Sequence, residues 1–570
     1  MPSPSKSGRG LRTALTLAVL GVAVYFAHRE IHAAAPAILN SDLAVAPLTS
    51  DLIRQGHWTF FQLEDTYGGN FLTWIRTAWV VFSMRALGTS AIDAHFSFNY
   101  FWLPWTFAAL AFALGSAYFS FATAAILGLA GAVGLNFFYT LYGVDFHVFA
   151  IFFGFLVLTV AGRYPAYRDP WRNLNLPTLF GAGVVAGFAH YTSRMADIFL
   201  AALFVPWRDL GHALCAKFGA RTRADRAVLG LGLAFVALYA YLQTFGQTVG
   251  TWNGRPVKIW ATPNLHNAAL CFAWVWVKNN PSLRSRRNLV RGGVFLLGLA
   301  IGFMPELISM WMRGHGARSV PDADFHGMLM GIGQIPGALR AIFTGGPESS
   351  PGFYASWLLL TGLTIFGIRH SRYRVAVAAL AVAMLAFILK RPYADAPPRY
   401  LVAVVPPLWL GLGAAIEGAT KNKVVRSFGL ALVAVLLLFH LGDQLSTRRD
   451  WAASLLASGG VARDDSITAE FRRLGVPVVL TENFWEANRR TLLSNWAPPF
   501  VSDETTSAQP YTALAQVDQA RRVGILLSAK ADPSANGNGD DEIEVMGRRF
   551  KRIHSSRVGD YRLHVGERIP

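Results

Sequence analysis

Cysteine and charge are both scarce in this chain of 570 residues. The two cysteines, Cys215 and Cys271, lie far apart and have no histidine or cysteine at metal-ligand spacing, so the sequence predicts neither a disulfide framework nor a zinc site. Charged residues make up only 15% of the chain, whereas soluble globular domains contain about 25%. A phosphate-binding glycine loop and short-period repeats are missing as well. These absences argue against an ordinary soluble domain, a P-loop nucleotide-binding protein and a repeat protein.

Apolar residues dominate the composition instead. They make up 53% of the chain, and the mean hydropathy is +0.34, which indicates a membrane protein. The net charge of +18 would also suit a nucleic-acid-binding protein, but many basic residues stand in short clusters between apolar segments. That distribution is typical of the inner loops of a membrane protein. Membrane lipids are therefore expected partners, and nucleic acid is not.

The apolar segments predict a polytopic α-helical membrane domain over residues 1–443, with about 13 spans. A polar, basic stretch at 1–12 precedes the first apolar segment, which is either a cleaved signal peptide or a retained helix. We expect a retained helix with a cytoplasmic N-terminus, because many further apolar segments follow. The expected spans are 13–27, 96–117, 121–140, 146–161, 178–192, 196–206, 227–245, 263–277, 291–311, 353–369, 373–390, 399–418 and 426–443.

The apolar stretch 71–87 is not counted as a span. It contains Arg76 and Arg85, and an arginine near the bilayer centre costs about 2.5–3.5 kcal/mol. We therefore expect a helix at the outer membrane interface within a first outer loop over residues 28–95. If 71–87 does not cross the membrane, every basic cluster lies on the cytoplasmic side, as the positive-inside rule requires. This agreement favours the interfacial helix. The clusters lie at 163–172, 208–226, 278–287, 369–374 and 421–426.

Residues 444–570 are polar and predict a small α/β domain outside the membrane. Short apolar runs at 476–480, 523–527 and 561–565 are typical of strands. Helical stretches are expected around 467–474 and 485–493, and a loop rich in Asn, Gly and Asp at 529–541.

Five outer residues are candidates for chemistry: Asp42, Glu64, Asp65, Asp145 and His147. The topology places all five on one side of the membrane. A sugar transfer requires a carboxylate that accepts the acceptor's proton or holds a metal ion against the leaving phosphate. Each residue also has a structural explanation, since the acids can cap helices or line solvated turns and the histidine can be an interfacial core residue.

Arg399 and Tyr400 are further candidates at the outer end of the 399–418 segment. Fixed positive charge at an outer surface runs against the positive-inside bias, and an arginine there can bind a lipid phosphate. The alternative is that the Arg-Tyr pair anchors the helix at the interface. His190 and Arg194, at another outer helix end, are weaker candidates. The outer loop 312–352 contains His315, Asp322, Asp324 and His326 at a spacing that fits no standard metal motif.

These motifs resemble the C-type superfamily of membrane glycosyltransferases, which includes protein O-mannosyltransferases and lipid A aminoarabinose transferases. The segment NSDLA at 40–44 is similar to the first outer loop of that superfamily, where an essential aspartate follows the first span. EDTYGGNFLTW at 64–74 resembles its acidic residue before an interfacial helix, in a form closer to uncharacterised bacterial members. Asp145 matches the second outer aspartate, and PRYLV at 398–402 is similar to the Arg-Tyr-Leu segment near the end of the bundle.

The resemblance implies an inverting transferase in the bacterial inner membrane that uses a polyprenyl-phosphate sugar donor. Asp42 would act as the base or orient the acceptor. Glu64, Asp65, Asp145, His147, Arg399 and Tyr400 would bind substrate. The acceptor, whether glycan, lipid or protein, is left open, and so is a divalent cation, because Leu43 stands where the superfamily's acidic pairs would place a second acid. The alternatives are a transporter or lipid-linked-sugar flippase, and an assembly protein whose outer domain recruits partners.

Overall fold

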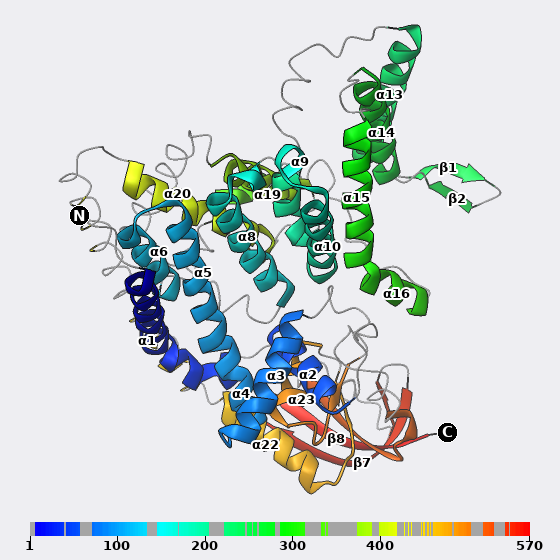
Figure 1. The fold of residues 1–570 in the computed structure, drawn as a ribbon. Coiled ribbons are helices and arrows are strands. Elements are labelled where there is room, and N and C mark those ends of the chain that lie inside the picture. Colours follow the sequence, from blue (N-terminus) through cyan, green and yellow to red (C-terminus); the bar gives the residue numbers. More distant parts are fainter. Residues whose placement is uncertain are drawn as a thin grey trace.

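The computed structural model describes most of the predicted helices and strands. It covers residues 6–38, 41–56, 71–133, 145–168, 170–204, 222–245, 248–252, 255–258, 261–279, 286–313, 332–336, 338–339, 373–389, 398–418, 460–481, 484–502, 517–528, 542–545 and 548–569, with single or paired residues between 427 and 457. Figure 1 shows a bundle of helices with a β-sheet at one end.

The segment expected as the first outer loop contains several helices. The helices of the N-terminal part are α1 (Lys6–Ile38), α2 (Ser41–Arg54), α3 (Phe71–Ala86) and α4 (Ala91–Ser97), followed by the π-helix η1 (Phe98–Trp102) and by α5 (Leu103–Tyr118). The placing of 28–95 as an outer connection between the first two spans stays a prediction. Helix α4 begins where the Ser90 side chain accepts a hydrogen bond from the Asp93 N–H, a normal N-cap.

The remaining helices form the bundle and its side branch. They are α6 (Phe121–Val133), α8 (Asp145–Arg163), η2 (Pro165–Arg168), α9 (Pro170–Asn173), α10 (Leu176–Thr192), η3 (Arg194–Ala196), α11 (Asp197–Phe204), α13 (Arg223–Phe245), α14 (Ala261–Asn279), α15 (Arg286–Gly302), α16 (Met304–Arg313), α19 (Arg374–Leu389), η6 (Pro398–Val404) and α20 (Val405–Gly418). A hairpin of β1 (Thr248–Trp252) and β2 (Arg255–Lys258) joins α13 to α14.

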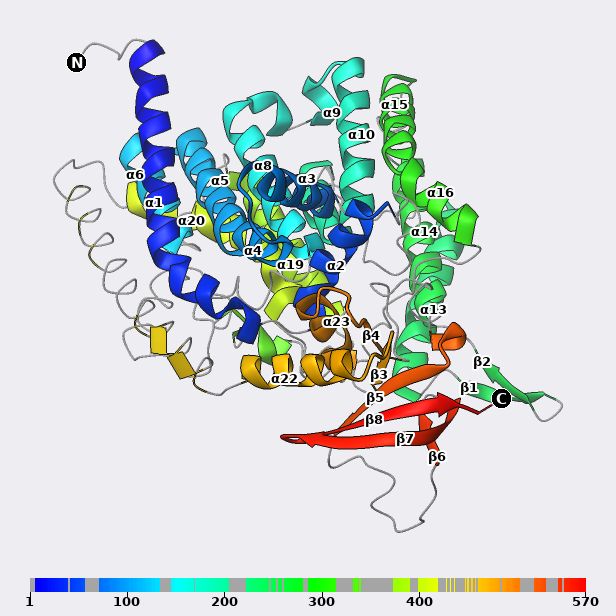
Figure 2. The ribbon, with the colours of Figure 1, turned by 90° about the horizontal axis from the view of Figure 1, so that it is seen from below.

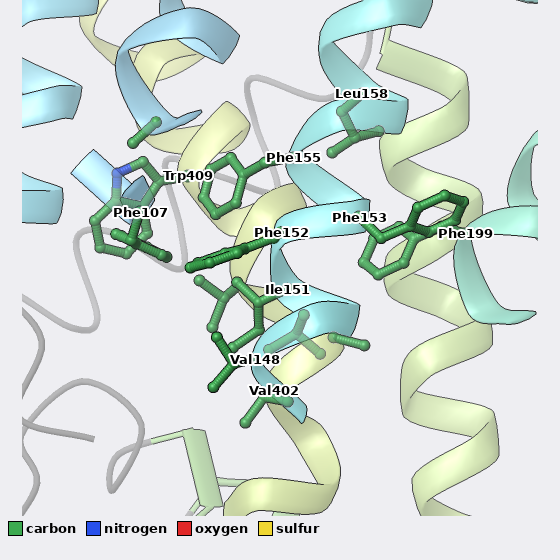
Figure 3. Close-up of a cluster of buried hydrophobic side chains, with 14 of the residues drawn as sticks. Phe107, Val148, Ile151, Phe152, Phe153, Phe155, Leu158, Phe199, Val402 and Trp409 are labelled. Carbon is green, nitrogen blue, oxygen red and sulfur yellow. The ribbon is translucent and has the colours of Figure 1, made fainter. Parts of the chain in front are cut away.

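Aromatic side chains fill the centre of the bundle. Phe107 of α5 packs edge-on against Phe155 of α8 at 5.0 Å and against Trp409 of α20 at 5.5 Å between ring centroids; Figure 3 shows the three together. Small residues bring α10 and α15 together: a Cβ added at Gly187 would clash with the carbonyl oxygen of Leu299. Such close approach is typical of helices that pack in a membrane.

Contacts between distant segments fix which helix ends lie together. The Glu417 carboxylate accepts hydrogen bonds from the Ser120 N–H at 2.6 Å and the Thr123 hydroxyl at 3.0 Å, so the end of α20 lies at the α5–α6 turn. Tyr118 stacks on Tyr373, which places the start of α19 there as well. The starts of α5, α8 and η6 and the end of α10 therefore lie at the opposite end, which carries α2 and is called here the α2 end.

The predicted C-terminal α/β domain is confirmed as a mixed sheet with two helices. The elements are α22 (Gly460–Arg473), β3 (Val479–Thr481), α23 (Phe484–Leu493), β4 (Phe500–Val501), β5 (Arg522–Ser528), β6 (Glu542–Val545), β7 (Arg548–Val558) and β8 (Tyr561–Arg568). Strand order is β4-β3-β5-β8-β7-β6, with β3 parallel to both β4 and β5 and the other pairs antiparallel. Figure 1 and Figure 2 both show this domain beside α2. The loop expected at 529–541 lies outside the described residues.

Three of the described helices are long and apolar enough to cross a membrane: Gly10–Arg29, Ala91–Tyr118 and Arg223–Leu242. Shorter apolar helices coincide with other expected spans, at 121–132, 147–163, 375–388 and 401–414. The count of about 13 stays a prediction, because 353–369 lies outside the described residues and 426–443 is described only at isolated positions. The span expected at 291–311 is corrected: α15 ends at Gly302, and α16 begins anew at Met304.

Candidate functional site

The α2 end gathers the backbone positions of the predicted site residues that the structure describes. Asp42 lies in the first turn of α2, Asp145 begins α8, and Arg399 and Tyr400 lie in the first turn of η6. His147 is buried in the first turn of α8, with its Nδ1 atom 2.9 Å from the sulfur of Met195. Glu64 and Asp65 lie outside the described residues.

Aromatic contacts tie the start of α3 to this end of the bundle. The ring of Phe71, the first residue of α3, packs edge-on against Phe149 of α8 and Phe188 of α10, at 6.4 and 5.5 Å between centroids. Phe149 is one helical turn beyond Asp145. Helix α3 therefore begins beside the first turns of α8.

Helix η6 is held against the same part of α8. Val402 is fully buried in one cluster with Val148 and Ile151, and Figure 3 shows the three side chains in neighbouring positions. Val402 and Val148 each come three residues after a candidate, Arg399 and Asp145. The starts of the two helices are thus neighbours at the α2 end.

A buried polar network lies between α2, α3 and the α4–η1 helix, and the sequence interpretation missed it. His95 Nε2 lies 3.2 Å from Asp51 Oδ1, and the Arg54 Nε atom approaches the same oxygen at 3.4 Å. Arg76 donates a hydrogen bond from Nη2 to Asn99 Oδ1 at 3.0 Å. His95 and Arg76 are completely buried, and Asp51 and Asn99 nearly so.

Arg76 shows how the apolar helix α3 accommodates a buried charge. Its guanidinium carbon lies 4.9 Å from the centroid of the Phe98 ring, in addition to the hydrogen bond to Asn99. Arg85, nine residues further on, is exposed. A buried arginine requires such partners, because an isolated charge in an apolar interior is strongly unfavourable. The interpretation of 71–87 as a helix is confirmed, while Arg76 points into the protein rather than into solvent.

The sequence contained two signals for this network. His95 and Asn99 are four residues apart and therefore lie on one face of a helix, and Arg76 stands out in an otherwise apolar segment. Asp51 gave no signal, because its partner His95 is 44 positions away. The contact of α2 and α3 with α4 is tertiary and cannot be read from local pattern.

A second histidine–carboxylate pair lies nearby at the end of α10. His190 Nδ1 lies 2.8 and 2.7 Å from the two carboxylate oxygens of Asp197 at the start of α11, and both side chains are partly exposed. Between them in sequence is Met195, which contacts His147. This arrangement fixes which nitrogen of His190 faces the carboxylate, as in general acid–base pairs. Arg194, the other weaker candidate, begins η3 beside this pair.

Within the described ranges, no group of three or more His, Cys, Asp or Glu side chains is placed to hold a metal ion. His315, Asp322, Asp324 and His326 of the expected outer loop lie outside these ranges. The described part of the α2 end places two acidic residues at helix starts and an arginine at the start of η6.

Comparison with known proteins gives two similar solved structures. No protein-family model and no curated protein matches the chain. It is similar to an oligosaccharyltransferase of Archaeoglobus fulgidus in complex with zinc and sulfate, with 12% identity and a TM-score of 0.45 over 90% of this chain and 68% of that chain. It is also similar to ArnT from Cupriavidus metallidurans bound to undecaprenyl phosphate, with 12% identity and a TM-score of 0.41 over 99% of each chain.

Proposed function

We propose that this protein is a membrane glycosyltransferase that moves a sugar from a polyprenyl phosphate to an acceptor outside the cytoplasmic membrane. The observation that carries the proposal is the meeting of the starts of α8 and η6, with Asp145 and Arg399, at the end of the bundle that also carries α2 and the C-terminal domain. Helix-capping acids and membrane-anchoring residues with purely structural roles would not need to lie at the same end of the bundle.

The proposed reaction is a single displacement at the anomeric carbon. The acceptor's hydroxyl oxygen forms the new bond to that carbon, and the bond from the carbon to the phosphate oxygen breaks. The polyprenyl phosphate leaves with the electron pair, and the configuration inverts. Asp42 takes the acceptor's proton, which is general base catalysis. Glu64, Asp65, Asp145 and His147 are proposed to line the site.

Arg399 is proposed to bind the donor phosphate, with Tyr400 beside it. Arginine presents a planar fork of N–H donors that matches phosphate oxygens. A divalent cation, if the enzyme uses one, would be held by the oxygens of Asp42 and Asp145 and would polarise the leaving phosphate. The proposal needs no third protein ligand, since such a cation retains water and phosphate oxygens.

The α2 end is proposed to face the outside of the bacterial inner membrane. The support is the sequence topology, in which the basic clusters lie on the cytoplasmic side. Helix α8 begins at Asp145 and ends at Arg163. Within this helix, the acidic residue therefore lies at the α2 end and the basic residue at the opposite end. The C-terminal domain would then lie outside as well, because α23 packs against α2.

A direct assay of transfer tests the function and the role of Arg399 together. Purified protein in lipid nanodiscs is given a polyprenyl-phosphate sugar and a set of acceptors, and products are measured by mass spectrometry. Arg399→Ala is expected to weaken donor affinity about tenfold to a hundredfold, because a hydrogen bond to a charged group contributes about 1.5–3 kcal/mol. The rate at saturating donor should change much less.

Arg163→Ala is the matched control, because Arg163 is exposed at the far end of α8. It should leave donor affinity unchanged. Movement of intact donor between leaflets without product would favour a flippase instead. Equal affinities in the wild type and in Arg399→Ala would remove Arg399 from the donor site.

A further inference from the structure

Two consecutive residues of the C-terminal domain adopt a left-handed backbone. Asn495 has φ 52° and Trp496 has φ 63°, directly after helix α23. Asparagine tolerates this region, but a bulky residue such as tryptophan rarely adopts it. Such strain persists only where the surrounding structure fixes it, and it often marks functional positions.

Several hydrogen bonds hold this turn in place. The Trp496 N–H donates to the carbonyl oxygen of Thr491 at 3.0 Å. The Arg472 guanidinium of α22 donates to the carbonyl oxygens of Ala497 and Ser494, at 2.6 and 2.7 Å. The backbone on both sides of Trp496 is therefore fixed from a neighbouring helix, and the direction of its side chain is set.

The Trp496 side chain packs against the buried apolar cluster that extends from the bundle to α23. That core cluster includes Ala44 and Leu48 of α2 and Leu492 of α23, all almost completely buried. Helices α2 and α23 are in contact and lie side by side in Figure 1 and Figure 2. The indole N–H is buried without a hydrogen-bond acceptor among the described residues, so packing is the interaction that the structure shows for the side chain.

Helix α2 thus contacts both the bundle and the C-terminal domain. Asp51 pairs with His95 of the bundle, and α23 of the C-terminal domain contacts α2. Asp42 lies two residues before Ala44, in the same helix. A small shift of a catalytic group can lower a rate about a hundredfold, so the contact of α2 with the C-terminal domain bears on the position of Asp42.

We infer that Trp496 is a positioning residue: its strained turn fixes α2 against the bundle and so fixes Asp42 for catalysis. The role of Asp42 in catalysis rests on the proposed function, whereas the packing of α2 by Trp496 does not. It makes the C-terminal domain a component of the active site rather than an independent module.

Hydrogen exchange of the full-length protein in nanodiscs tests the positioning directly. Exchange of amides in α2 reports local opening of that helix. Trp496→Ala should raise the exchange rate of the α2 peptide about tenfold or more and leave β5 and β8 of the domain unchanged. The maximal transfer rate should fall about 10- to 100-fold, while the KM for the donor stays within about twofold. Trp496→Phe, which keeps an apolar ring, should restore both.

Trp274→Ala on α14 is the matched control, because Trp274 is largely exposed, and it should change neither quantity. Unchanged exchange in α2 for Trp496→Ala would overturn the inference. So would loss of protection throughout the sheet in both Trp496 variants, since Trp496 would then stabilise its own domain. If α2 opens as expected but the wild type transfers no sugar, the proposed function fails and the packing role of Trp496 stands.

Discussion

The Asp42→Asn variant is expected to transfer sugar about 10²–10⁴ times more slowly than the wild type, because its amide cannot accept the proton of the attacking hydroxyl. The exchange preserves the shape of the side chain. Asparagine is as acceptable as aspartate at a helix start, so α2 should still begin at Ser41. The loss should appear in the rate at saturating donor and acceptor, measured as product formed by purified protein.

Asp93→Asn is the matched control for this prediction. Asp93 is an exposed carboxylate in the first turn of α4, and removal of its charge should leave the rate within about twofold of the wild type. If Asp42→Asn retains full turnover in a protein that unfolds at the wild-type temperature, Asp42 only caps α2 and another group must be the base.

The second large effect is expected on stability. His95→Leu should destabilise the protein by about 1–3 kcal/mol, the usual cost of leaving a buried hydrogen-bond acceptor without its partner. The Asp51 carboxylate then keeps the Arg54 Nε atom at 3.4 Å but loses its completely buried partner. Unfolding in mixed micelles, followed by tryptophan fluorescence, gives the difference in free energy.

The double variant Asp51→Leu/His95→Leu shows whether the loss of stability in His95→Leu comes from the broken Asp51–His95 contact or from changed packing. Its loss of stability should be smaller than that of His95→Leu alone, because no unpaired carboxylate remains in the interior. A double variant as unstable as the sum of the two single variants would show that Asp51 and His95 do not depend on each other.

Local pattern was sufficient for three strands and two helices of the C-terminal domain, whereas β4, β6 and β7 were not predicted. The apolar runs at 476–480, 523–527 and 561–565 correspond to β3, β5 and β8, because alternation and β-branched residues act within a few positions. The order of the strands was not predictable. Strand β5 pairs in parallel with β3 but antiparallel with β8. That pairing depends on contacts across the domain and not on local sequence.

The positions of the bundle helices were predicted better than the contacts between them. Hydropathy located α5, α8, α10 and α19, since each is apolar over most of its length. The break between α15 and α16 was missed although Gly302 and Pro305 flank it, and these residue types often mark the end or the start of a helix. Arg76 was placed at the interface, because its charge is costly in lipid. Its partner Asn99 is 23 positions away, so only the fold shows that the charge is accommodated inside.

The roles of the candidate site residues stay predictions, and the residues that support them were missed. Asp42, Asp145 and Arg399 were identified by position relative to apolar segments. Asp51, His95 and Trp496 were not identified, because each acts through a contact between elements that are distant in sequence.

The central claim is that one site at the α2 end joins Asp42, Asp145 and Arg399 around a lipid-linked sugar. An experimental structure of the protein with a bound polyprenyl-phosphate sugar tests it most directly. We expect the phosphate within hydrogen-bond reach of Arg399, and the carboxylates of Asp42 and Asp145 on the order of 10 Å apart, since one phosphate–sugar junction must meet both. A lipid phosphate bound at the opposite end, near Glu417, or packed helices between the two carboxylates, would contradict the claim.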